Sequence, residues 1–144
     1  MGKYKFALDS VLSWRESQEE DAKRDFLVSQ EAQRQQETIL ENYIAASEEI
    51  KNDAVNYLDI NSLRQQYIYK NHLENEIIKQ QETVDHFSIE TEKMKEVFVD
   101  AQKERKIMDR LKEKHHDAYM FVQKTEEQKE LDEMGTLRFG NSLL

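Results

Sequence analysis

The sequence predicts an all-α protein built as a long antiparallel two-helix coiled coil, an α-hairpin. Three observations support this prediction. The 144-residue chain has no proline and no cysteine, and its three glycines are Gly2, Gly135 and Gly140. Apolar residues recur at alternating steps of three and four, which gathers them into one stripe along a helix. Only one short segment, residues 59–62, carries residue types that end one helix and begin the next.

The second half of the chain shows the heptad pattern most clearly. Most of the stepped positions are apolar, although only 38% of the whole chain is hydrophobic. An apolar residue every 3.5 positions keeps a seam facing a partner helix in a left-handed coiled coil. The stepped positions are Leu63, Gln66, Lys70, Leu73, Ile77, Gln80, Val84, Phe87, Thr91, Met94, Phe98, Ala101, Arg105, Met108, Lys112, His115, Tyr119 and Val122.

The first half carries the same period more weakly, and its stretch from Ser29 to Gln36 is polar. Its stepped positions are Leu8, Leu12, Arg15, Glu19, Ala22, Phe26, Ser29, Gln33, Gln36, Leu40, Tyr43, Ser47, Ile50, Ala54 and Tyr57. We therefore expect one coiled-coil domain over residues 1–144. Helix one spans about 4–57, a turn 58–61, helix two about 62–134, and a loose tail 135–144. Asp59, Asn61 and Ser62 can each cap the second helix.

A short connection makes two consecutive helices run antiparallel. We expect facing seam positions to have residue numbers that sum to 120, as for Phe26 and Met94. One mismatch in this register places Arg15 opposite Arg105. Residue 4 lies opposite residue 116, so the second helix is expected to extend past the first from about His116 to Met134.

This extension carries apolar side chains for which the register provides no partner. They are Tyr119, Phe121, Val122, Leu131 and Met134. Exposed apolar residues on a single helix indicate a docking site for another protein. The alternatives are a bend at the start of helix one or dimerisation through this end. Gly135 is a helix-stop signal, so we expect the helix to end there.

A second apolar group lies early in helix two. Its members are too many for one seam: Tyr67, Ile68, Tyr69, Leu73, Ile77 and Ile78. Leu73 and Ile77 are expected to face inward. The others either wrap around Leu40, Tyr43 and Ile44 of helix one or form a second docking patch.

Composition argues against several classes of protein. The net charge is −9, and no basic stripe of the kind that binds phosphates is present, so we expect no nucleic-acid partner. No apolar run is long enough to span a membrane, and the N-terminus lacks an apolar signal segment, so we expect a cytoplasmic protein. We also expect no catalytic residues, no cofactor and no metal. The best metal motif, Glu113-x-x-His116, is a single step, whereas di-iron helical bundles use two such steps and two more glutamates.

Three stretches carry a family resemblance that covers nearly the whole chain. They are residues 6–22, residues 101–114, and the most specific one, Glu127-Gln128-Lys129-x-Leu131-Asp132-Glu133. Together they resemble the FliJ family of the bacterial flagellar type III export apparatus. Gly135 departs from the family pattern, which more often continues with a small helix former.

The resemblance implies a fold similar to the stalk (gamma) subunit of rotary ATPases. It also implies that the joined ends of the hairpin enter the flagellar export ATPase hexamer and promote its assembly and activity. Other implied partners are the cytoplasmic part of an export-gate membrane protein and empty export chaperones. The protein would be a monomer on its own, at the inner-membrane face of the flagellar basal body.

The residues expected at the ATPase ring are Gln128, Lys129, Leu131, Asp132, Glu133, Phe6, Leu12 and Arg15. Tyr69, Leu73 and Ile77 are expected at the export gate, by position rather than by a matched motif. The alternatives are the stalk protein of a virulence type III secretion system and a stand-alone coiled-coil scaffold.

Overall fold

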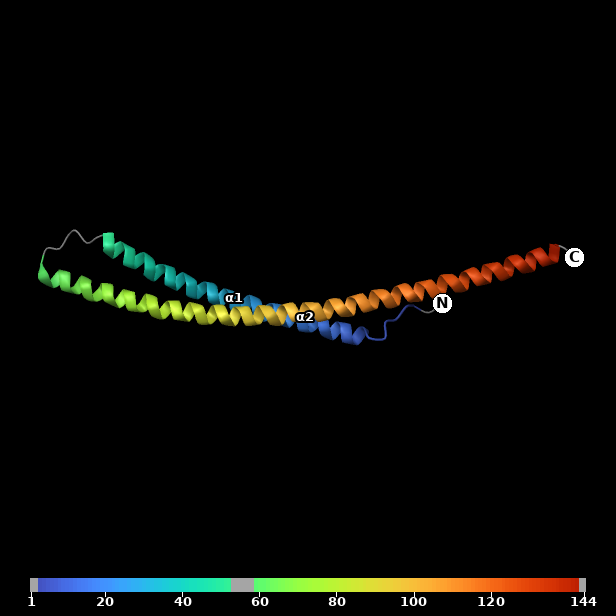
Figure 1. Ribbon diagram of the computed structural model, residues 1–144, viewed down its shortest axis with the longest axis horizontal. Coiled ribbons are helices and arrows are strands. Elements are labelled where there is room, and N and C mark those ends of the chain that lie inside the picture. Colours follow the sequence, from blue (N-terminus) through green and yellow to red (C-terminus); the bar gives the residue numbers. More distant parts are fainter. Residues whose placement is uncertain (1–2, 53–58, 143–144) are drawn as a thin grey trace. The chain divides into compact units, whose positions relative to one another are not determined.

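The computed structural model describes residues 3–52 and 59–142, and both elements found there are helices (Figure 1). Helix α1 spans Asp9–Asn52 (44 residues) and helix α2 spans Ile60–Ser142 (83 residues). The all-α hairpin predicted from the sequence is confirmed. Of the predicted turn 58–61, residue 58 lies outside the described residues, and Ile60 and Asn61 already belong to α2. The seam positions Ala54 and Tyr57 also lie outside the described residues.

Both helix starts have a local explanation. At α1, the amide of Asp9 donates to the carbonyl oxygen of Phe6 (3.1 Å), and the Asp9 carboxylate lies in the first turn, where the helix dipole favours negative charge. At α2, the predicted cap forms: the amide of Ser62 donates to the Asp59 side chain (2.8 Å). Asp59 thus satisfies one of the free amides of the first turn.

The helix bounds differ from the prediction in two places. Helix α1 begins at Asp9 rather than near residue 4. The expected helix stop at Gly135 and loose tail from there are wrong, because α2 continues through Gly135 to Ser142. Gly135 has no positive φ angle, which the common glycine stop requires. A glycine inside a helix costs only about 1 kcal/mol relative to alanine, and no proline follows to end the helix.

The residues group into two compact units, and residues 20–100 form the second of them. In this unit the predicted seam positions from Ala22 to Ile50, and from Gln66 onward, are all buried or half-buried. Leu73 is the most buried apolar side chain, with 4% exposed. The rings of Phe26 and Phe98 pack with centroids 6.1 Å apart. The apolar seam therefore forms where the heptad steps place it over these ranges, whereas Leu63, the first stepped position of the second helix, is exposed.

The polar stretch of this seam is satisfied by hydrogen bonds between the helices. The Gln80 amide donates to both the backbone carbonyl and the side-chain oxygen of Gln36, at 2.9 Å each. The Thr91 hydroxyl donates to the carbonyl oxygen of Ser29 at 3.1 Å. Because buried polar groups are costly only when unpaired, the polar layer fits within the seam.

The first unit combines residues 1–19 with residues 101–144. Phe6 and Leu12 are its most buried apolar side chains. Contacts in each unit scatter around the predicted register. The residue numbers of Ser29 and Thr91, and of Tyr4 and His116, sum to 120, whereas those of Phe26 and Phe98 sum to 124 and those of Gln36 and Gln80 to 116, one helical turn to either side. A slip of one heptad would change this sum by seven.

Candidate protein-interaction surfaces

Exposed apolar side chains gather on two stretches of α2. We call residues 120–140 the C-terminal arm, and we call Tyr67, Ile68, Tyr69 and Ile78 the early-α2 patch. Single exposed apolar residues are normal on a protein surface, whereas a group on one helix indicates a contact site. The C-terminal arm belongs to the unit of residues 1–19 and 101–144, and the early-α2 patch to the unit of residues 20–100.

In the C-terminal arm, every side chain from residue 124 to residue 140 is exposed. Phe121 is 71% exposed and Leu131 is 62% exposed. Apolar surface contributes to stability only when it is removed from water, so these side chains add little to the stability of the helix. The other exposed apolar side chains of the arm include Met120, Val122, Met134 and Leu137. In Figure 1 the arm is the orange-to-red part of α2, which continues past the N-terminal segment of the same unit.

The signature residues of the arm lie on its exposed surface. The Gln128 amide donates to the Asp132 carboxylate at 3.1 Å, which joins two of the five predicted ring-contact residues one helical turn apart. Lys129, Leu131 and Glu133 are exposed beside them. All five are accessible to a partner protein.

The three N-terminal residues predicted at the ring are placed differently. Phe6 and Leu12 are buried, with 6% and 5% of their surface exposed. Arg15 is half-buried, and its guanidinium lies 3.8 Å from the Glu104 carboxylate. In this unit Phe6 and Leu12 pack against α2, so only Arg15 of the three presents part of its side chain to solvent.

An aromatic cluster holds the N-terminal segment onto α2. The Tyr4 ring packs against His116 (5.0 Å between centroids) and Tyr119 (5.2 Å), and the Phe6 ring packs against His115 (5.6 Å). The Tyr4 hydroxyl also donates to the carbonyl oxygen of Lys112. Tyr119 was expected to lack an intramolecular partner, and this expectation was wrong because Tyr4 reaches it from outside the helix. The 120 register, which pairs residue 4 with residue 116, was the available signal for this cluster.

A charge cluster resolves the predicted mismatch between Arg15 and Arg105. The Arg105 guanidinium donates to the carboxylates of Glu19 on α1 and Asp109 on α2. The hydrogen bonds that Arg105 donates to Glu19, and then to Asp109, raise the pKa of its guanidinium above the ordinary value. Arg15 meanwhile pairs with Glu104. Each arginine therefore pairs with a carboxylate on the other helix, Arg15 with Glu104 and Arg105 with Glu19.

The early-α2 patch contains one of the three residues predicted at the export gate. Tyr69 is 49% exposed, whereas Ile77 is half-buried and Leu73 lies in the seam. Tyr67, Ile68 and Ile78 are more exposed than Tyr69. These side chains do not wrap around α1, so the patch presents its apolar groups to solvent.

In residues 3–52 and 59–142, no three His, Cys, Asp or Glu side chains are grouped so as to hold a metal ion. Within those same ranges, neither helix offers a stretch apolar and long enough to cross a bilayer.

A helical hairpin with a packed seam and exposed apolar helix faces defines a coiled-coil interaction protein. The family model described as "Flagellar FliJ protein" matches residues 4–144. The chain therefore belongs to the FliJ family, as the three sequence stretches predicted, and is a protein associated with flagellar type III export. Neither the curated proteins nor the solved structures provide a match to this chain.

Proposed function

We propose that this protein is the stalk of the flagellar export ATPase: it binds the ATPase ring, promotes ring assembly and raises the rate of ATP hydrolysis. The observation that carries the proposal is the C-terminal arm, a helix whose side chains are exposed from residue 124 to residue 140. The family match supports the setting, since it is to a flagellar family rather than to a virulence secretion stalk.

The arm suits a narrow binding site. A single helix is about 10–12 Å across, less than a two-helix coiled coil, so it fits where a hairpin does not. Its apolar residues, such as Phe121 and Leu131, provide buried area on binding, at roughly 25 cal/mol per Å². Its polar residues, Gln128, Lys129, Asp132 and Glu133, provide directional contacts that fix orientation.

Packed residues of the same unit hold α2 in place on the N-terminal side of the arm. Phe6 and Leu12 are buried against α2, and Arg105 joins Glu19 of α1 to Asp109 of α2. A helix held at its base loses less conformational entropy when it binds. In this proposal Phe6 and Leu12 therefore act by positioning the arm, and Arg15 is the N-terminal residue able to contact the ring.

A stalk would activate the ring through unequal contacts rather than through chemistry of its own. One asymmetric helix inside a ring of equivalent subunits makes different contacts with each subunit. Each subunit is therefore bound in a different conformation. The difference in binding free energy shifts the conformational equilibrium of each subunit, which is how a partner can change catalytic turnover without contributing a catalytic group.

The proposal extends to the export gate, with the early-α2 patch as its contact. Tyr69 would make this contact together with the more exposed Tyr67, Ile68 and Ile78, while Leu73 supports the helix from the seam. A ring bound at the arm and a gate bound at this patch would hold the protein peripherally at the inner-membrane face of the basal body. Empty export chaperones are the third proposed partner.

Steady-state ATP hydrolysis by the flagellar export ATPase of the same organism tests the stalk. We expect saturable stimulation and hexamer formation as this protein is added. Gln128→Ala combined with Asp132→Ala should abolish the stimulation while leaving helicity and thermal melting unchanged, because both side chains are exposed.

The matched control removes a similar intrahelical contact elsewhere on α2. The Gln81 amide donates to Asp85 at 3.1 Å, with the same four-residue spacing and the same exposure as the pair in the arm. Gln81→Ala with Asp85→Ala should keep full stimulation. A flat response by the wild-type protein with an active ATPase would contradict the proposal.

A further inference from the structure

We propose that the solvent face of α1 around Leu27 and Val28 is a self-complementary surface on which a second copy of this chain packs antiparallel, as a weak two-fold dimer. We call this surface the Leu27 face. It comprises Glu20, Lys23, Arg24, Leu27, Val28, Glu31, Ala32, Arg34 and Gln35. The proposal is independent of the stalk function, because all its residues belong to the unit formed by residues 20–100.

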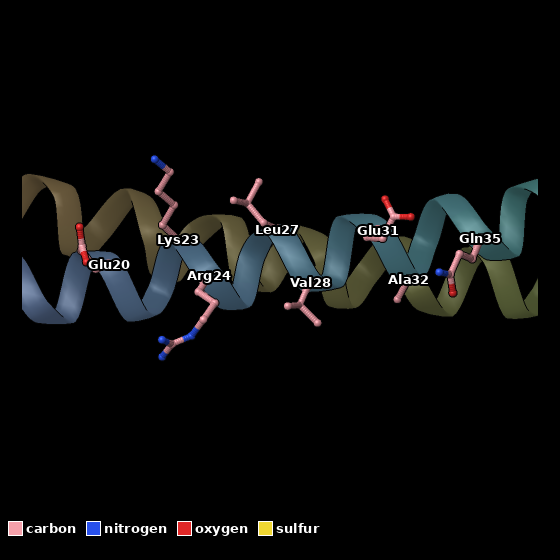
Figure 2. Close-up of a pocket in the computed structure, with 8 residues that line it drawn as sticks. All are labelled: Glu20, Lys23, Arg24, Leu27, Val28, Glu31, Ala32 and Gln35. Carbon is pink, nitrogen blue, oxygen red and sulfur yellow. The ribbon is translucent and has the colours of Figure 1, made fainter.

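The Leu27 face is open and has an apolar centre. Leu27 is 50% exposed and Val28 is 64% exposed, although coiled coils usually place polar residues on the side opposite the seam. Figure 2 shows both side chains on the side of α1 that faces away from α2, with Ala32 beside them. Leu27, Val28 and Ala32 line a shallow surface pocket together with charged side chains on either side.

The charges of the Leu27 face follow a definite order along the helix. In the direction of the chain they are acidic at Glu20, basic at Lys23 and Arg24, apolar at the centre, acidic at Glu31 and basic at Arg34. An antiparallel copy presents the reverse order, so each acid meets a base. A parallel copy in register would place each acid opposite an acid.

Helix geometry places these groups at matching heights. With 3.6 residues per turn, Arg24 and Glu31 lie almost on the same line along the helix, at equal distances on either side of the apolar centre. A two-fold axis through that centre brings Arg24 of each copy opposite Glu31 of the other, and brings Glu20 opposite Gln35, next in sequence to Arg34. Leu27 then meets its own copy, and so does Val28. Such an interface is isologous: each contact occurs twice.

The existing ion pairs on this face do not prevent such contacts. Arg24 pairs with Asp21 at 2.9 Å and Arg34 with Glu31 at 2.8 Å, both within α1. The side chains of Arg24 and Arg34 are 70% and 74% exposed, and exposed pairs contribute about 0–1 kcal/mol. The arginines can therefore turn to a second copy at little cost.

The size of the Leu27 face sets the strength of the dimer. One helix face with two large apolar side chains falls below the roughly 1,200 Å² of total buried area typical of stable complexes. The dimer should therefore be weak and form only at high protein concentration. This is compatible with the expectation of a monomer at low concentration.

Sedimentation equilibrium of the full chain over a wide concentration series tests the dimer. We expect the average mass to rise from monomer toward dimer with increasing protein concentration, and to rise less at high salt.

Glu31→Arg should weaken the dimer about tenfold, because it creates two repulsive contacts with Arg24. Arg24→Glu should do the same, and the double variant Arg24→Glu with Glu31→Arg should restore association. The control Glu96→Arg changes the same charge on the exposed surface of α2 and should have no effect.

Cross-linking tests the orientation, because the chain has no cysteine of its own. Val28→Cys should form a disulfide between copies under mild oxidation. Gln35→Cys should not, since an antiparallel pair separates the two Gln35 positions by about 20 Å along the helix. A monomer at all concentrations, a double variant no better than the single ones, or equal cross-linking at both positions would overturn the proposal.

Discussion

Two stretches of α2 have the same kind of sequence and opposite environments. Residues 66–100 place their seam residues against α1, whereas residues 124–140 are exposed on every side chain. Both stretches are charged helices with scattered apolar residues and no proline. The comparison teaches that a heptad residue stabilises this fold only where a partner helix covers it. Where none does, the same residue type stays exposed to solvent.

Truncating one leucine in each stretch should give the largest contrast. Leu73→Ala removes a buried side chain and should lower the free energy of unfolding by about 2–3 kcal/mol, the low end for buried leucines because the seam is thin. Leu131→Ala removes an exposed one and should change it by less than about 0.5 kcal/mol. Urea denaturation followed by circular dichroism measures both. Equal losses would mean that the arm is packed in solution.

Breaking the Arg105 cluster should have an intermediate effect. Arg105→Met leaves the Glu19 carboxylate, whose side chain is only 17% exposed, without its partner. We expect a loss of about 1–2 kcal/mol, reduced from the value for a fully buried pair because solvent reaches the site. Arg24→Ala, which removes an exposed pair with Asp21, serves as control and should cost under about 0.5 kcal/mol. Thermal melting that ranks the two variants in the opposite order would contradict this.

Replacing the glycine of the arm should have the smallest effect. Gly135→Ala places a methyl group where nothing beyond the neighbouring residues and the backbone of its own helix lies within 4 Å. It should stabilise the arm helix locally by about 0.5–1 kcal/mol, since glycine is the poorer helix former. Slower amide hydrogen exchange around residue 135, with global unfolding unchanged, is the expected outcome. Faster exchange there would show that the glycine favours the helical arm in some other way.

Much of the fold could be predicted because heptad periodicity is a local property of the chain. The seam positions, the Asp59 cap and the register around 120 all follow from residue spacing and the reach of a short connection. The continuation of α2 past Gly135 could not be predicted in this way. A glycine stop depends on the backbone adopting a positive φ angle, and here the helical conformation continues instead.

The candidate surfaces were predicted less completely than the seam. The exposed residues from Gln128 to Glu133 were identified, but Phe6 and Leu12 proved to be buried, and Leu73 lies in the seam. Spacing alone places a residue on a helix face without showing whether a segment outside the helix covers that face. Residues 3–8 are such a segment, and through Tyr4 and Phe6 they contact His115, His116 and Tyr119.

The sequence by itself determined that this protein is a two-helix coiled coil of the FliJ family, because period, capping and the C-terminal signature are all written along the chain. Only the tertiary structure decided which apolar side chains remain open. Burial depends on which segments meet in space, and this is why the arm and the Leu27 face became candidate surfaces while Leu73 did not. The pairing of Arg105 with Glu19 also depends on the tertiary structure. A long side chain can reach several carboxylates, and the spacing of residues in the sequence does not distinguish between them.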